Sequence, residues 1–255
     1  MQKIGAFAAL VAILVSVGAG AAQAQQPTPW TGPYAGIGGG MVDLQANFSD
    51  QTSIIRGDFF QGSASAGPAS DVSAAVRDCS ALTLVACGSE QFSAGPAFGG
   101  IGWITLGYDD EVIKNLILGT FIDLDFGGQG LKATDQFGDM WKLTPHETLY
   151  AGARAGARVA DPTLLYVDTG FVRGWFNFNY NGEYSTNDAF NGIFAGIGVE
   201  QKLGGALRAK FEYRVADYMG GQVGVLQFNP FVTDTHSAVP LQQTFRIGID
   251  YAIGQ

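Results

Sequence analysis

The chain has 255 residues, including 37 glycines; 15% of its residues are charged and its formal net charge is −9. With 47% apolar residues, this composition argues against a coiled coil and against a disordered chain, and it is typical of a glycine-rich all-β protein. The acidic balance also argues against a nucleic-acid partner, because phosphate binding requires an excess of Lys and Arg.

The first 24 residues predict a signal peptide. Lys3 precedes an apolar run from Ile4 to about Val17, and Ala22-Gln23-Ala24 supplies a small-residue cleavage site. An N-terminal membrane helix is the alternative, although the run is shorter than the ~20 residues that a span needs. We expect Sec export, a signal peptide at 1–24 and one mature domain at 25–255.

Eight later segments alternate apolar and polar residues with the period of a β-strand. They are 34–46, 96–108, 115–126, 147–160, 163–178, 190–203, 206–218 and 241–253. No later segment has the continuous apolar run of a transmembrane helix, but a barrel strand needs only ~10 alternating residues to span a bilayer.

The connections between these segments alternate in length. The short ones are 109–114, 161–162 and 204–205, and the long ones are about 47–95, 127–146, 179–189 and 219–240. This pattern predicts an eight-stranded antiparallel up-and-down transmembrane β-barrel, with short periplasmic turns and long extracellular loops.

Segment 206–218 places Arg208, Lys210, Glu212 and Arg214 on one face and apolar residues on the other. A water-soluble, lipocalin-like barrel would turn these charges outward, whereas a membrane barrel would turn them into its lumen. Gly192, Gly196 and Gly198, on the face that carries Glu200, favour the membrane barrel, because glycine weakens a strand unless another group must approach closely.

Aromatic residues at the segment ends also favour the membrane barrel. They predict two interfacial girdles, although aromatic residues are common in strands of every kind. The turn-side girdle would comprise Tyr34, Tyr108 and Tyr251, and the loop-side girdle Phe126, Trp175, Phe190 and Tyr218.

An inward polar face brings six basic and six acidic residues into the lumen. This predicted charge network comprises Asp123, Asp125, Arg154, Arg158, Asp168, Glu200, Arg208, Lys210, Glu212, Arg214, Arg246 and Asp250. Buried charges need partners, so the balance favours a salt-bridged plug. An ion path through the lumen is the competing interpretation.

Cys79 and Cys87 lie in the first long connection, and in an exported protein this spacing predicts a disulfide. Free thiols or a metal site are weaker alternatives, since no His or acidic cluster lies near them. We expect no metal and no cofactor.

The histidines give little support to catalysis. His236 is followed by Ser237, and neighbouring strand residues point to opposite faces, so the two cannot form a nucleophile–base pair. His146 is followed by Glu147 but has no serine partner in the sequence. A lipid A-modifying enzyme is therefore the least favoured hypothesis.

Three stretches resemble one family. They are WTGPYAGIGGG (30–40), RAGARVADPTLLYVDTGFVRG (154–174) and GIGVEQKLGGALRAKFEYRVADY (196–218). Each is similar to a motif of the small eight-stranded outer-membrane proteins known as porin-family or OmpA-like β-barrel proteins, of alphaproteobacterial type. The resemblance covers the mature chain.

The resemblance implies a non-catalytic, structural or surface-interaction protein in the outer membrane of a Gram-negative bacterium. A narrow channel for ions or small solutes is the alternative function. The implied partners are outer-membrane lipids, lipopolysaccharide and the barrel-assembly machinery. Two features depart from the family: the chain ends Ile253-Gly254-Gln255 without a terminal aromatic, and no peptidoglycan-binding domain follows the last segment.

Overall fold

The computed structural model describes residues 30–55, 84–135, 138–229 and 232–254. The predicted signal peptide (1–24) and Cys79 of the predicted disulfide lie outside the described residues.

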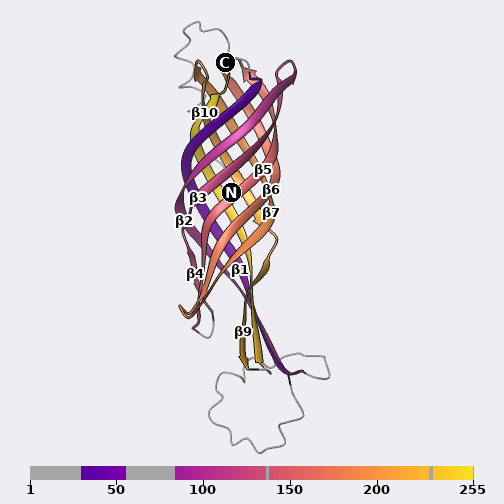
Figure 1. Cartoon of the computed structure of the whole chain (residues 1–255), viewed down its shortest axis with the longest axis vertical. Helices are drawn as coiled ribbons and strands as arrows, with labels where there is room; N and C mark the ends of the chain where they lie inside the picture. The colour runs from indigo at the N-terminus through magenta and orange to yellow at the C-terminus, as the bar shows by residue number, and fades with distance from the viewer. Residues whose placement is uncertain (1–29, 56–83, 136–137, 230–231, 255) are drawn as a thin grey trace, which may run out of the picture.

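The described chain folds into ten β-strands that form one antiparallel sheet (Figure 1). Their bounds are β1 Gly32–Ile55, β2 Leu84–Ile113, β3 Leu116–Gly127, β4 Leu131–Thr134, β5 Met140–Ala160, β6 Thr163–Tyr180, β7 Tyr184–Gly204, β8 Leu207–Tyr218, β9 Gly221–Asn229 and β10 Val232–Ala252.

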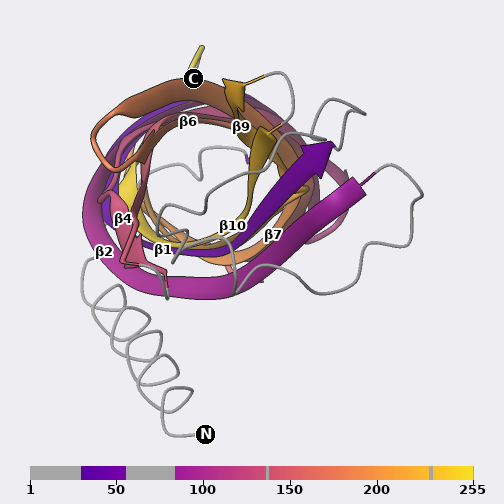
Figure 2. The same ribbon diagram turned by 90° about the horizontal axis from the view of Figure 1, so that it is seen from below.

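Eight of these strands close into a ring. The order is β1-β2-β3-β5-β6-β7-β8-β10, and β10 pairs back with β1, so the ring has no free edge (Figure 2). The two remaining strands are additions at the loop end, where β4 pairs with β5 and β9 pairs with β10. The predicted eight-stranded up-and-down barrel is therefore confirmed.

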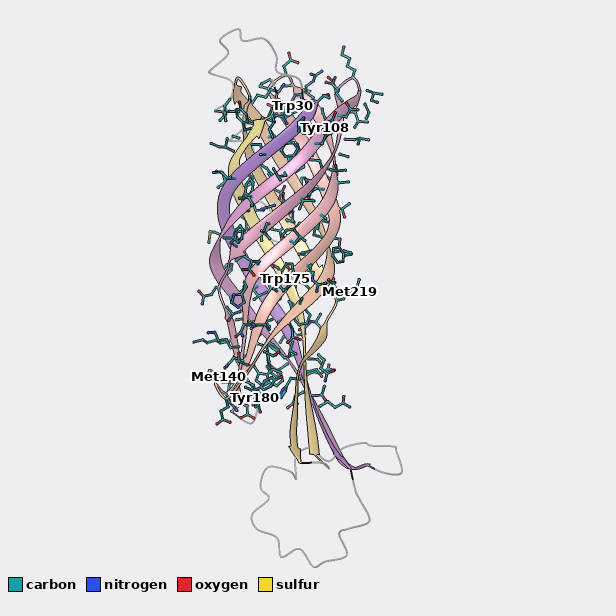
Figure 3. The ribbon with its side chains drawn as sticks, in the orientation of Figure 1. Trp30, Tyr108, Met140, Trp175, Tyr180 and Met219 are labelled. Atoms are coloured by element: carbon teal, nitrogen blue, oxygen red, sulfur yellow. The ribbon has the colours of Figure 1, made fainter. Side chains whose placement is uncertain are left out.

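Two-residue turns join the strands at one end of the barrel. Lys114 and Asn115 link β2 to β3, and Asn115 adopts a left-handed conformation with φ of 69°, which Asn tolerates better than most residues. Gly205 does the same between β7 and β8, with φ of 56°. Trp30 and Tyr108 mark this turn end in Figure 3, whereas Met140 and Tyr180 lie at the opposite, loop end.

The strands continue well into the ranges that the sequence assigned to long loops. β1 pairs with β10 as far as Ile54 and Val232, and with β2 as far as Ile55 and Leu84. The predicted ranges were too short because ladder hydrogen bonding continues where the alternation of apolar residues fades. The result is a paired extension that projects beyond the ring at the loop end (Figure 1).

The inside and outside of the ring follow the strand alternation. Arg208, Lys210, Glu212 and Arg214 of β8 are buried inside, whereas apolar residues such as Ile122, Val167 and Ile193 are exposed on the outer wall. A water-soluble barrel has the reverse arrangement. None of the described segments is a helix long and apolar enough to cross a membrane.

Candidate functional site in the barrel lumen

The lumen contains a cluster of buried charges, here called the charge cluster. Its members are Asp109, Asp123, Asp125, Arg154, Asp168, Glu200, Arg208, Lys210, Glu212, Arg214, Arg246 and Asp250. Eleven of them are residues of the predicted network. The twelfth predicted residue, Arg158, lies near the turn end, partly exposed, and pairs with Glu111 at 3.1 Å.

Arg246 binds three carboxylates of the cluster. Its guanidinium donates to Asp123 and Asp125 at 2.7 Å each and to Glu212 at 2.9 Å. Its Cζ atom also lies 4.7 Å from the ring centre of Trp103. These contacts join β10 to β3, across the lumen, and to its neighbour β8, so one side chain ties together distant parts of the wall.

Arg214 performs a similar role beside it. Its guanidinium donates to Asp123 at 2.9 Å and to Asp168 at 2.8 Å, and lies 2.8 Å from Glu212. The ring of Tyr150 lies 4.7 Å from its Cζ atom, within the range of a cation–π contact. Two arginines thus share the carboxylates of Asp123 and Glu212.

A second group of ions lies closer to the turn end. Arg154 donates to both carboxylate oxygens of Asp109, at 2.8 and 2.5 Å, and also to Glu200. Arg208 adds a contact of 3.2 Å to Asp109. The bidentate geometry is the strong form of an arginine–carboxylate pair.

Sequence reasoning missed Asp109, because residue 109 was assigned to a turn. β2 continues to Ile113, and Asp109 stands an even number of residues after the inward-pointing Trp103 and Thr105, so its side chain also points inward. Extending the predicted strand 96–108 by one residue would have found it. With Asp109 included, the buried charge cluster holds seven carboxylates and five cations, so its formal charge is 5 − 7 = −2.

Glycines make room for the large side chains of the lumen. A Cβ atom added to Gly248 would lie 2.3 Å from the Trp103 ring, and one added to Gly198 would lie 2.3 Å from the ring of Tyr166. The hydroxyl of Tyr166 donates to Glu212 at 2.8 Å. At these two positions, glycine on the inner face leaves room for an aromatic side chain.

Trp30 fills the turn end of the lumen. It is fully buried with Ile117 and Leu164. The Nζ atom of Lys202 and the Cζ atom of Arg208 lie 4.5 and 4.8 Å from its ring centre. An apolar group with cations against its ring therefore closes this end.

The loop half of the lumen is filled by aromatic and aliphatic side chains, here called the aromatic core. Its buried members include Phe48, Trp141, Leu143, Phe176, Phe178, Phe190, Phe194 and Tyr218. The Trp141 ring packs edge-on against Phe178 at 5.5 Å and against the buried His236 at 4.7 Å. The sequence did not predict this core, because Phe48, Trp141, Leu143 and His236 lay in ranges assigned to loops.

The aromatic girdles need a correction. Tyr108, Tyr251, Phe126 and Trp175 are exposed on the outer wall, as a girdle requires. In contrast, Tyr34, Phe190 and Tyr218 are buried inside the barrel. Their positions in the alternation explain this, because each stands an even number of residues from the inward-pointing residues of its own strand.

His146 and Glu147 are both exposed, because β5 has a bulge at this point. Pro145 pairs with Phe176 and Thr148 with Gly174, so two residues of β5 stand opposite one residue of β6. His236, in contrast, is buried inside the barrel, where it packs against Trp141 of the aromatic core.

A closed sheet with a polar, charged interior and an apolar outer wall defines the class of transmembrane β-barrels. Residues 12–252 match the family model described as the outer membrane protein beta-barrel domain, and the chain belongs to this family. It is accordingly an outer-membrane protein of the Gram-negative cell envelope.

Solved structures with a similar fold include outer-membrane proteins of three bacteria. OprG of Pseudomonas aeruginosa is 9% identical, with 87% of this chain and 97% of that chain covered and a TM-score of 0.46. The protease OmpT of Escherichia coli is 9% identical, with 91% and 99% covered and a TM-score of 0.41. Ail of Yersinia pestis, the attachment invasion locus protein, is 10% identical, with 81% and 98% covered and a TM-score of 0.33. No curated protein matches the chain in sequence.

Proposed function

We propose that this protein is a non-catalytic outer-membrane barrel with a closed lumen, which stabilises the envelope and presents its loop-end extension at the cell surface. The observation that carries the proposal is the continuous filling of the lumen. From the turn end, the lumen holds the Trp30 group, the charge cluster and the aromatic core in succession. An eight-stranded barrel has just enough interior space for such side chains.

The pairing of the charges supports a structural role. Arg154, Arg214 and Arg246 each bind at least two carboxylates. An ion that crosses the lumen would have to break several of these buried pairs, and each break leaves a charge without a partner. A cross-linked interior of this kind fixes the strands relative to one another.

Planar-bilayer recording tests the closed lumen. The purified full-length protein should give no steady single-channel current. A steady current that is lost in Arg154→Ala or Asp123→Ala would instead establish the narrow channel. Because the charge cluster has two more carboxylates than cations, such a channel would select cations.

The non-catalytic part of the proposal has its own test. His146 and Glu147 are exposed on the outer wall, but no serine lines the hollow in which they lie. Deletion of the gene should leave the mass profile of lipid A unchanged. A shifted profile that the wild-type gene restores and a His146→Ala gene does not would overturn this part.

A further inference from the structure

A hollow opens on the outer wall of the barrel, beside the bulge of β5. Its volume is about 480 Å³, within the size range of small-molecule sites. Four strands supply its lining, which consists of Leu124, His146, Glu147, Trp175, Phe176 and Asn187. The hollow therefore combines apolar residues with three polar side chains.

The bulge creates this combination. In a regular strand, His146 and Glu147 would point to opposite faces. Here both are exposed, because the pairing of β5 with β6 skips from Pro145 to Thr148. Pro145 has no N–H group to donate to the ladder, which suits a site where the pairing is interrupted. An imidazole and a carboxylate are thus presented side by side on the wall that faces lipid.

The hollow lies at the boundary between the apolar and polar parts of the outer wall. On β6, the exposed apolar residues Val167 and Phe171 are followed by Trp175, and the next outward residues are Asn177 and Asn179. The amide of Asn177 donates to Ser185 of β7 at 2.9 Å, so the wall beyond Trp175 is polar. Tryptophan is enriched at such lipid–water boundaries.

This boundary is the one on the extracellular side. Trp175 lies toward the loop end relative to Tyr108, which marks the turn end (Figure 3). In outer-membrane barrels the short turns face the periplasm and the long loops face outward. A lipid that reaches the hollow therefore belongs to the outer leaflet.

We infer that the hollow binds the phosphorylated sugar headgroup of an outer-leaflet glycolipid. Trp175 and Leu124 offer an apolar surface for the ring of a sugar, while Glu147 and Asn187 offer hydrogen-bonding groups for its hydroxyls. Arg173 supplies a cation for a phosphate, since its guanidinium lies 5.6 Å from the ring centre of Trp175 on the same outer face.

The inference does not depend on whether the lumen conducts. The charge cluster lies inside the barrel, whereas the polar groups of the hollow are exposed outside it. A conducting lumen would overturn the proposed function and leave the headgroup site intact. Conversely, loss of the headgroup site would leave the closed lumen unchanged.

Tryptophan fluorescence provides a direct readout of the hollow. Of the four tryptophans in the chain, Trp30, Trp103 and Trp141 are buried, whereas Trp175 is 36% exposed and lines the hollow. The full-length protein in detergent should show a saturable fluorescence change on titration with lipopolysaccharide. Titration with phosphatidylethanolamine should give no saturable change. An equal saturable response to both lipids would identify ordinary lipid contact and overturn the inference.

Point variants locate the binding to the hollow. Asn187→Ala removes a hydrogen-bonding amide, and Glu147→Gln replaces one acceptor oxygen of the carboxylate with an amide donor; each should weaken lipopolysaccharide binding about tenfold. Glu183→Gln is the matched control, because Glu183 is an exposed carboxylate in the turn between β6 and β7, and it should bind as the wild type does. All three variants should keep the gel mobility shift on boiling that reports a folded barrel. Wild-type affinity in both folded hollow variants would contradict the site.

Discussion

Replacement of Arg246 by Met tests whether the charge cluster stabilises the barrel. The guanidinium of Arg246 is fully buried and binds three carboxylates at 2.7 to 2.9 Å. Arg214 still binds Asp123 and Glu212 in the variant, but Asp125 loses its partner. Removal of one member of a buried pair costs about 3–5 kcal/mol, and we expect Arg246→Met to lower the free energy of unfolding by this amount.

The double variant Arg246→Met/Asp125→Asn separates the charge from the packing. Asn keeps the shape of Asp125 but removes the negative charge that Arg246→Met leaves without a partner. The double variant should therefore regain about 1–3 kcal/mol relative to Arg246→Met alone.

Urea unfolding of the full-length protein in lipid bilayers provides the measurement. Tryptophan fluorescence and the mobility shift of unboiled samples should report the same transition, as two-state unfolding requires. An Arg246→Met barrel within 1 kcal/mol of the wild type would refute the reasoning. A double variant less stable than Arg246→Met would do so as well.

Three further substitutions are tested by the same unfolding assay. Gly248→Ala should cost about 1–3 kcal/mol, because the new Cβ atom would lie 2.3 Å from the Trp103 ring. Gly102→Ala is the control and should cost less than half as much, since its Cβ atom would lie 3.9 Å from the carbonyl oxygen of Gly38. Equal costs would exclude crowding as the cause. Arg158→Met should change stability by less than about 1 kcal/mol, since its pair with Glu111 is partly exposed, and a loss of 3 kcal/mol would place Arg158 energetically within the charge cluster.

The fold could be predicted because outer-membrane strands carry a strong pattern. Eight alternating segments joined by connections of alternating length permit few arrangements other than an up-and-down barrel. The extended ends of the strands could not be predicted. In the paired extension, the partner strands supply the hydrogen bonds, and these depend on residues far away in sequence, such as Ile54 and Val232.

The alternation of inward and outward positions along each strand also predicts which aromatic residues can belong to a girdle. Phe190 has the same parity as Glu200 on β7, and Tyr218 has the same parity as Arg214 on β8. A side chain on the charged face cannot also belong to an outer girdle. The position of a residue along its strand predicts its height along the barrel axis. Its place in the alternation predicts whether its side chain points inward or outward. A girdle residue must lie near a membrane boundary and also point outward.

The bulge at His146 and Glu147 is different in kind. A bulge is defined by the count of residues on two paired strands, so a single strand does not reveal it. Pro145 is a hint, because proline interrupts a ladder, but it does not indicate which residues become unpaired. The hollow on the outer wall, and with it the inferred headgroup site, depends on this irregularity and on the contact with β6.

The types of residue that face the interior and the outside change along the barrel axis, because the wall is surrounded by lipid in one part and by water in the other. On β6, inward Tyr166 and Asp168 accompany outward Val167 near the turn end, whereas inward Phe178 accompanies outward Asn177 near the loop end. The first arrangement suits a wall in lipid, and the second suits a wall in water. β6 thus follows the pattern of a membrane barrel, polar inside and apolar outside, within the membrane. Beyond the membrane it follows the pattern of a water-soluble barrel, apolar inside and polar outside. Where lipid surrounds the wall, the apolar side chains face outward and the charge cluster fills the interior. Where water surrounds the wall, polar side chains face outward and the aromatic core fills the interior.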